Sequence, residues 1–268
     1  MEGQTNILEI QDVGYAYGGV WAVNGCSFGV VRGGVTGLIG PNGAGKSTLI
    51  EILSGTLQPA QGSVVYEGRD TRGWGPVRMA REGIARTFQT ARVFARLPVI
   101  ENVMIAAQHQ TGESPLRAVF AHRSWREQEM ALRKEATDLL AWLGLHEHLE
   151  RPAGSLSGGQ RRLMEMARAL MAHPQVLLLD EPTAGVFPEV SQLIATRVRD
   201  IAGQGVTVLV VAHNMAFLAA IADEVVCMAE GKVLARGSLD TVRENEEVIA
   251  AYLGATATVS RATSAGGV

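Results

Sequence analysis

Short apolar runs separated by glycine-rich turns dominate the hydrophobic pattern of the chain. Residues 176–179 are continuously apolar, which is typical of a central strand buried on both faces of a parallel sheet. Residues 35–39 and 206–211 predict two further buried strands. Residues 7–35 alternate or run apolar between glycine-rich turns and predict antiparallel strands, and 62–68 predict another short strand. The pattern therefore predicts an α/β protein with an antiparallel part near its N-terminus.

Helical periodicity marks residues 99–151. Apolar side chains recur at helical spacing in this region, and Gly144 follows them as a C-terminal stop. The recurring positions are Leu132, Ala136, Leu139, Leu140 and Leu143. We interpret the region as a helical insert. His146 and His148 are two residues apart, so on a helix they point in different directions, and we expect no metal site there.

The C-terminal part of the chain combines strands with a helix. Residues 223–231 and 232–237 predict a strand pair, and a final helix is expected to reach about Leu253. The segment 255–268 is rich in Ala, Thr, Ser and Gly, and we expect it to be disordered.

Composition narrows the class of protein. The chain has 268 residues, 47% of them hydrophobic, which is enough to bury a sizeable core. The net charge of −3 gives no general attraction to nucleic acid or anionic membranes. Cys26 and Cys227 lie in apolar surroundings and are expected to be buried thiols of a cytosolic protein, with a disulfide as the alternative. We see no secretory signal and no stretch long enough to span a bilayer, so a membrane role requires a partner.

Arginine residues gather with two phenylalanines between residues 78 and 96. The set comprises Arg78, Arg81, Arg86, Phe88, Arg92, Phe94 and Arg96. Basic residues interleaved with aromatic ones can bind single-stranded nucleic acid, but the acidic balance of the chain argues against this. We interpret the stretch as a solvated helix face or a protein docking surface, and we expect no nucleic-acid partner.

The most specific motif is the glycine-rich loop at residues 40–48. It fits G-x-x-x-x-G-K-[ST] at every fixed position, between a predicted strand and a predicted helix. Its glycines let the backbone wrap around an anion, and its N–H groups face the phosphates. Lys46 would supply a positive charge to the β- and γ-phosphates, and Ser47 a hydroxyl to Mg²⁺. The alternative is an ordinary glycine-rich turn, but the sequence predicts a nucleotide-binding protein.

Polar residues follow two of the buried strands. Asp180 and Glu181 come directly after 176–179, at the end where doubly wound sheets bind ligands. Asp180 can hold Mg²⁺ through water, and Glu181 can polarise an attacking water. His213 follows the strand at 206–211 and is either a satisfied core residue or a hydrogen-bond partner of the γ-phosphate.

Two further features bear on nucleotide binding. Tyr17 precedes a Gly-Gly turn, and its ring either stacks on a base or packs as a strand aromatic. Leu156-Ser157-Gly158-Gly159-Gln160 opens a helix. A serine and two glycines at a helix start form either a second anion cradle or a simple N-cap.

Taken together, these motifs resemble the ATP-binding subunit of an ABC transporter. Residues 40–48 match the Walker A loop, 156–160 the LSGGQ signature, and 176–181 the Walker B strand with its glutamate. They occur in the family's order over residues 7–254. The resemblance implies a P-loop NTPase of the ABC ATPase fold, α/β, with a mixed RecA-like core, an antiparallel β subdomain and an α-helical subdomain, in one domain over 6–254.

The resemblance also divides that domain. It implies antiparallel β structure over 7–35, a P-loop core over 36–98 and 152–254, and a helical subdomain over 99–151.

Site residues follow from the same resemblance. It implies that Glu181 is the catalytic base and His213 the switch histidine of an ATP hydrolase. Gln89 matches the Q-loop, and with Ser47 and Asp180 it is expected to hold Mg²⁺. The residues expected to bind ATP are Tyr17, Asn42, Gly43, Ala44, Gly45, Lys46, Ser47, Thr48, Ser157, Gly158, Gly159 and Gln160.

Several stretches resemble the branched-chain amino acid importers within this family. They are residues 83–89, 92–94 and 99–103, the insert at 108–128 and the ending at 251–254. The solute could be Leu, Ile or Val, another amino acid, or urea. The resemblance implies a peripheral subunit on the cytoplasmic face of the membrane, attached to integral membrane permease subunits and served indirectly by a periplasmic or surface solute-binding protein.

A mechanism is implied as well. Two ATPase subunits pair head to tail, and each ATP lies between Lys46 of one and Ser157, Gly158 and Gly159 of the other. Importers of this type usually use two different ATPase subunits, so a heterodimer is expected, with a homodimer as the alternative. Gln89, its neighbours and the helical insert would carry the motion to a permease.

Two positions depart from the family's pattern. Gly185-Val186-Phe187-Pro188 stands where Gly-Leu-Asp-Pro or Gly-Leu-Asn-Pro is usual. Phe187 cannot make the polar contact across the dimer, so we expect weakened or asymmetric hydrolysis with ATP binding intact. Asn214 stands where Asp usually follows the switch histidine, which removes one charge near the pocket.

The main alternatives are other ABC ATPases. A soluble member acting in DNA repair would carry a long coiled-coil insertion, and one acting in translation usually carries two cassettes. This chain has one cassette and a modest insert. A lipid or lipopolysaccharide exporter is the alternative within transporters, and Arg86-Thr87-Phe88-Gln89 favours import. A non-hydrolysing regulator is a third possibility. Only Phe187 favours it, and Glu181 together with His213 argues against it.

Overall fold

A buried mixed sheet forms the centre of the molecule. The computed structural model describes residues 5–87, 93–108 and 122–253. The six-stranded sheet has the order β10-β9-β3-β8-β7-β6, parallel except for β10 against β9. Its strands are β3 (Val35–Ile39), β6 (Ile84–Arg86), β7 (Val176–Asp180), β8 (Thr207–Val211), β9 (Glu224–Ala229) and β10 (Lys232–Gly237). Every residue of β3, β7 and β8 is buried, as their continuous apolar runs predict.

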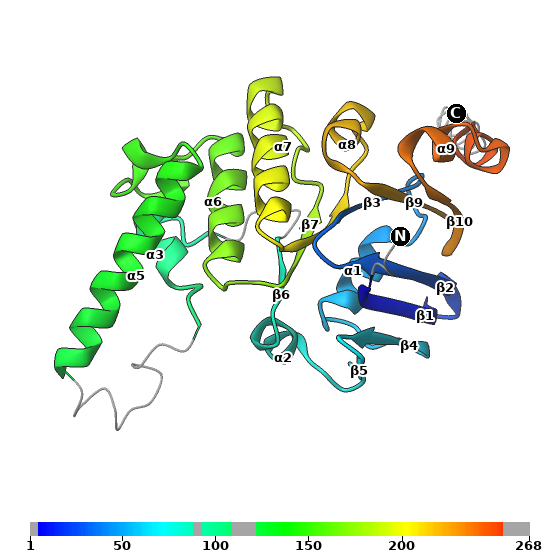
Figure 1. The fold of residues 1–268 in the computed structure, drawn as a ribbon, viewed down its shortest axis with the longest axis horizontal. Coiled ribbons are helices and arrows are strands. Elements are labelled where there is room, and N and C mark those ends of the chain that lie inside the picture. The colour runs from blue at the N-terminus through cyan, green and yellow to red at the C-terminus, as the bar shows by residue number, and fades with distance from the viewer. Residues whose placement is uncertain (1–4, 88–92, 109–121, 254–268) are drawn as a thin grey trace, which may run out of the picture.

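An antiparallel sheet packs beside it, with the order β2-β1-β4-β5 (Figure 1). Its strands are β1 (Asn6–Tyr17), β2 (Val20–Val31), β4 (Gln61–Tyr66) and β5 (Arg69–Asp70). The antiparallel strands expected within 7–35 are confirmed as β1 and β2. β4 and β5 come from the range 36–98. β4 pairs with β1, and β5 pairs with β4. The apolar pattern predicts strand β4 but not its pairing with β1, because strand pairing depends on tertiary contacts.

Two hydrophobic clusters cover opposite faces of the central sheet. Leu178 and Leu209 belong to the cluster shared with the antiparallel sheet and with α1 (Lys46–Leu53). Leu177 and Leu179 point into the other cluster, which the flanking helices close. These helices are α6 (Gly158–Leu170), α7 (Pro188–Gly203) and α8 (Met215–Ile221). The alternation along β7 therefore places the phosphate loop and the helical layer on opposite sides of one sheet.

The helical subdomain lies at the end of the molecule away from the antiparallel sheet (Figure 1). It contains α3 (Val99–Met104), α5 (His122–Trp142), and the 3₁₀ turns η2 (His146–His148) and η3 (Ala153–Ser155). α3 and α5 lie within the helical insert expected over 99–151, of which residues 109–121 fall outside the described residues. Gly144 has φ 76°, and the next N–H, of Leu145, donates to Leu140 O at 2.8 Å. This is the predicted glycine stop.

Asn102 ties α3 to the chain that precedes it. Its buried side chain accepts from Phe94 N–H at 2.9 Å and donates to the carbonyls of Phe94, Leu97 and Pro98 at 3.0–3.3 Å. One amide thus fixes the shape of residues 94–98, a role that the sequence pattern does not reveal.

The remaining elements agree with the expectations. β9 and β10 form the predicted antiparallel pair, followed by α9 (Leu239–Arg243) and helical residues 246–253. α2 (Pro76–Arg81) connects the antiparallel strands to β6. Cys26 and Cys227 are buried free thiols. The segment predicted to be disordered, 255–268, lies outside the described residues. Over the ranges that the structure covers, no helix combines the length and apolar character that a bilayer crossing requires.

Candidate active site

The phosphate loop joins β3 to α1 and is held tightly by its surroundings. Gly40 has φ 148°, and a Cβ there would lie 2.0 Å from Met228 O. Gly45 has φ 97°, and a Cβ there would lie 2.1 Å from Ala22 O. Neither position has room for a side chain, so the sequence pattern reflects the shape of the loop. Asn42, Gly43 and Ser47 are exposed, whereas Ala44 is buried.

Lys46 sits in the centre of this loop. Its Nζ donates to Gly40 O at 2.7 Å and to Pro41 O at 2.9 Å. Burial lowers the pKa of Lys46, and the nearby charges of Glu181 and Asp180 oppose that shift. The charges of both carboxylates therefore act on the lysine, as expected from the parallel strands whose carboxyl ends meet here.

Glu181 and His213 contact each other directly. Glu181 Oε1 lies 3.0 Å from His213 Nε2. Glu181 has φ 49°, a left-handed conformation that is uncommon for a residue with a side chain. Its N–H donates to Val211 O at 2.9 Å, which holds the turn against the end of β8. The structure thus brings Lys46, Asp180, Glu181 and His213 into one site.

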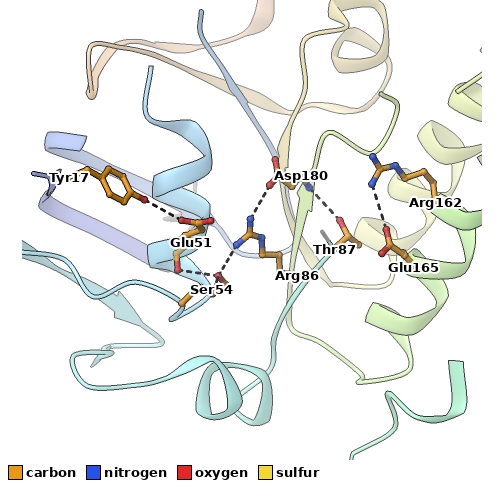
Figure 2. Close-up of polar contacts among 9 residues, drawn as sticks. Tyr17, Glu51, Ser54, Arg86, Thr87, Arg162, Glu165 and Asp180 are labelled. Carbon is orange, nitrogen blue, oxygen red and sulfur yellow. Dashed lines mark hydrogen bonds and ion pairs between the residues drawn. The ribbon is translucent and has the colours of Figure 1, made fainter. Parts of the chain in front are cut away.

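Arg86 corrects the interpretation of the arginine-rich stretch. Its side chain is only 11% exposed, and Nη2 lies 3.1 Å from Oδ2 of Asp180, whose side chain is 3% exposed. Its Nη1 reaches Ser54 Oγ at 3.4 Å (Figure 2). The next residue, Thr87, accepts from Asp180 N–H at 3.4 Å. Arg86 is therefore neither a solvated nor a docking residue; β6 pairs with β7 and turns it toward the acidic site.

Other members of the stretch have different surroundings. Arg78 lies over the ring of Trp74, 4.3 Å from its centroid. Arg81 and Arg96 are exposed, in keeping with a solvated or docking surface. Phe88, Gln89 and Arg92 lie outside the described residues, and with them the expected magnesium ligand Gln89.

A pocket of about 250 Å³ opens beside Arg86, between the central sheet and α6. Thr87 and Ser54 line it from the core, and Glu165 lines it from the helical side. Glu165 is buried and pairs with Arg162 at 3.6 Å (Figure 2). Charged side chains thus face the pocket from both the core and the helical layer.

Tyr17 lies beside the helix that follows the phosphate loop. Its hydroxyl is 3.5 Å from Glu51 Oε2, and half of the residue is exposed (Figure 2). Its ring meets that of Tyr15 edge to face, with centroids 4.9 Å apart. An exposed ring face near the loop fits the expected stacking role, although Glu51 was not foreseen as its partner.

Ser157 and Gln160 form a complete capping box at the start of α6. Ser157 Oγ accepts from Gln160 N–H at 3.3 Å, and Gln160 Oε1 accepts from Ser157 N–H at 2.9 Å. The simple N-cap is therefore present, and Ser157 and Gly158 remain exposed beside it. No hydrogen bond or ion pair within the described ranges joins this cap to the phosphate loop.

The two departures from the family's pattern occupy helix starts. Phe187 precedes α7, gives no side-chain cap and is 78% exposed. Asn214 caps α8, where its Oδ1 accepts from Phe217 N–H at 3.1 Å. Asparagine caps a helix about as well as aspartate, so the change at Asn214 keeps the local structure.

The C-terminal helix reaches the phosphate loop. Tyr252 is partly buried against the helical-side cluster. Burial raises the pKa of Tyr252 to about 12, and the backbone of Gly40 in the phosphate loop opposes that shift. The sequence marks this ending but gives no local signal of its position near the loop.

Known proteins share this architecture. The sequence model of the ABC transporter family matches residues 23–184. The structure superposes with a TM-score of 0.81 on a nucleotide-free ATP-binding cassette from an ABC transporter, at 34% identity over 92% of this chain and 99% of that one. The structure superposes on the ADP conformation of an ATP-binding cassette of an ABC transporter with a TM-score of 0.80, at 34% identity over 93% of this chain and 99% of that one. Fold and site thus define an ATP-hydrolysing ABC cassette.

Sequence comparisons narrow the class. The model of the branched-chain amino acid ATP-binding cassette transporter family matches residues 232–258. The chain is 36% identical to the Pseudomonas aeruginosa branched-chain amino acid transport ATP-binding protein BraF, over 92% of this chain and 98% of BraF. It is 34% identical to the probable branched-chain amino acid transport ATP-binding protein LivG of Methanocaldococcus jannaschii, over 95% of this chain and 100% of LivG. The chain belongs to this family and is the ATP-binding subunit of a branched-chain amino acid import transporter.

Proposed function

We propose that two ATPase subunits, each with its own phosphate loop, clamp ATP between them. The lysine-bearing loop of one subunit holds the phosphates, and Ser157, Gly158 and Gly159 of the other close over the γ-phosphate. The observation that carries this proposal is the separation of two anion cradles. Lys46 lies near the acids at the sheet edge, whereas no hydrogen bond or ion pair among the described residues joins the exposed signature cap to them.

Mg²⁺ fits the residues at the sheet edge. Ser47 offers an exposed hydroxyl and Asp180 a carboxylate, the oxygen donors that magnesium prefers. Asp180 already lies against a cation, the guanidinium of Arg86, in keeping with a carboxylate built to face positive charge. With Gln89, these residues would hold the ion, which neutralises phosphate charge when bound.

Glu181 and His213 are the proposed hydrolytic pair. Glu181 would orient the attacking water and take up its proton, since its carboxylate follows directly after Asp180. His213, 3.0 Å from Glu181, would hold that carboxylate and hydrogen-bond the γ-phosphate. Tyr17 would stack on the adenine ring. ATP then stabilises the closed pair, and ADP does not, because only the γ-phosphate reaches both cradles.

The partners follow from this mechanism. Integral membrane permease subunits would hold the chain at the cytoplasmic face of the membrane, and a solute-binding protein outside the membrane would deliver the amino acid. The second ATPase subunit would be a different chain. The exposed residues Arg81 and Arg96 would belong to the surface on which the permease docks.

Glu181→Gln tests the proposal. This variant should bind ATP with unchanged affinity, lose nearly all steady-state turnover, and pair with its cognate ATPase subunit in an ATP-dependent manner. Turnover that survives the substitution would refute the assignment of Glu181. A variant that stays unpaired with ATP, alone and with each cognate subunit, would refute the shared site. Co-purification with permease subunits, rather than with ribosomes or DNA, tests the assembly.

A further inference from the structure

The side chain of Gln160 contacts a histidine outside the signature motif. Gln160 Nε2 lies 2.9 Å from Nε2 of His148, the last residue of η2. Backbone hydrogen bonds fix His148 on both sides. Its N–H donates to Leu145 O at 2.9 Å, and its carbonyl accepts from Arg151 N–H at 3.0 Å. The backbone of His148 is therefore held in place within the turn that follows α5.

The hydrogen-bond pattern determines the state of both side chains. Ser157 N–H can only donate, so the Gln160 atom that faces it must be the oxygen. The amide NH₂ then points at His148 Nε2, and an NH₂ group can only donate. His148 Nε2 must accept, so the ring is neutral and carries its proton on Nδ1.

The other ring nitrogen makes no competing contact. Nδ1 of His148 is buried and finds no hydrogen-bond partner among the residues described. The hydrogen bond with Gln160 is therefore the contact that orients the ring.

We propose that His148 is a positioning residue for the signature helix. It holds the Gln160 amide so that Gln160 Oε1 stays on Ser157 N–H. The capping box then keeps Ser157 and the two glycines in the orientation that the partner's γ-phosphate requires. This inference rests on the proposed shared site, and it extends that site to the turn between α5 and η3.

Variants at position 148 separate positioning from folding. In the Glu181→Gln background, His148→Leu removes the acceptor, whereas His148→Gln supplies an amide oxygen in its place. His146→Leu is the matched control, because His146 lies on the same turn with its side chain exposed. For each protein, ATP affinity of the unpaired subunit is measured by nucleotide fluorescence, and ATP-dependent pairing with the cognate subunit by sedimentation.

We expect His148→Leu to weaken pairing about tenfold, the effect of one lost hydrogen bond, with ATP affinity of the unpaired subunit unchanged. His148→Gln and His146→Leu should pair like the parent. Equal pairing of His148→Leu and the parent would overturn the inference, as would equal loss in His148→Leu and His148→Gln.

A spectroscopic measurement tests the same contact without relying on the shared site. Nitrogen-15 NMR of the full chain should show His148 as the neutral tautomer protonated at Nδ1. A proton on Nε2 would overturn the inference. If the parent itself fails to pair with any cognate subunit, the proposed function is wrong, and the tautomer still decides whether His148 holds Gln160.

Discussion

Arg86 Nη2 lies 3.1 Å from Asp180 Oδ2, and this pair joins the end of β6 to the end of β7. Both side chains are largely withdrawn from water, so the pair offsets part of the cost of burying two charges. Arg86 is also the residue before the stretch that leads to Gln89. The acidic site and the segment expected to meet the permease are therefore connected through one guanidinium.

Replacing Arg86 should destabilise the chain. Arg86→Met leaves Asp180 buried without its ion-pair partner, and breaking a buried pair in this way costs about 3 kcal/mol. We expect that loss in the free energy of unfolding, measured by urea titration without nucleotide. Added Mg²⁺ and ATP should reduce the difference between variant and parent, because the ion supplies positive charge at the same carboxylate.

An exposed pair gives the control for Arg86. Arg32 Nη2 lies 2.7 Å from Glu67 Oε1, and the arginine side chain is 46% exposed. Arg32→Met should cost less than about 1 kcal/mol, the usual range of a surface ion pair. Equal losses of unfolding free energy in the two variants would mean that the buried Arg86–Asp180 pair contributes no more to stability than an exposed pair.

Phe187→Asp should raise ATP turnover in the assembled transporter. Phe187 is 78% exposed at the start of α7, where the family usually has a polar residue that reaches across the dimer. Restoring one hydrogen bond at the partner site is worth about fivefold in rate. ATP affinity of the isolated subunit should not change. Turnover equal to or below that of the parent would contradict the prediction.

Asn102→Leu should lower the free energy of unfolding by about 2 kcal/mol, because Phe94 N–H loses its hydrogen-bond partner. The carbonyls of Phe94, Leu97 and Pro98 each keep a backbone donor. Glu101→Gln, at the exposed neighbouring position, serves as the control and should be nearly neutral. Thermal unfolding of the three proteins side by side decides the matter.

The two thiols should be unreactive in the native protein. Burial raises the pKa of Cys26 to about 12, and that of Cys227 to about 11, with the charge of Lys46 opposing the second shift. The reactive thiolate is therefore scarce at pH 8. A thiol reagent such as Ellman's should label neither residue until denaturant is added, and then both. Rapid labelling before denaturation would contradict their burial.

Motifs that are contiguous along the chain are predictable from the sequence alone. The phosphate loop, the acids after β7 and the signature cap each depend on a few neighbouring residues, so their spacing already determines their local shape. The same holds for β3, β7 and β8, whose burial follows from uninterrupted apolar runs.

Contacts between distant segments were not predictable in the same way. Arg86 meets Asp180 from 94 positions away, and the sequence placed it on a surface. His148 was considered only with His146, whereas its partner is Gln160. Tyr252, at the opposite end of the domain sequence, lies near Gly40. Each of these contacts depends on how the sheets and helices pack, which no single stretch of residues specifies.

The phosphate loop is wedged between backbone atoms of two different sheets, with Ala22 O of β2 against Gly45 and Met228 O of β9 against Gly40. A methyl group at Gly45 would clash with the antiparallel sheet, and a methyl group at Gly40 would clash with the central sheet. Either clash would push that sheet away from the loop. Conversely, a shift of β2 relative to β9 would deform the loop itself. The conformation of the phosphate loop therefore depends on the position of the N-terminal antiparallel sheet.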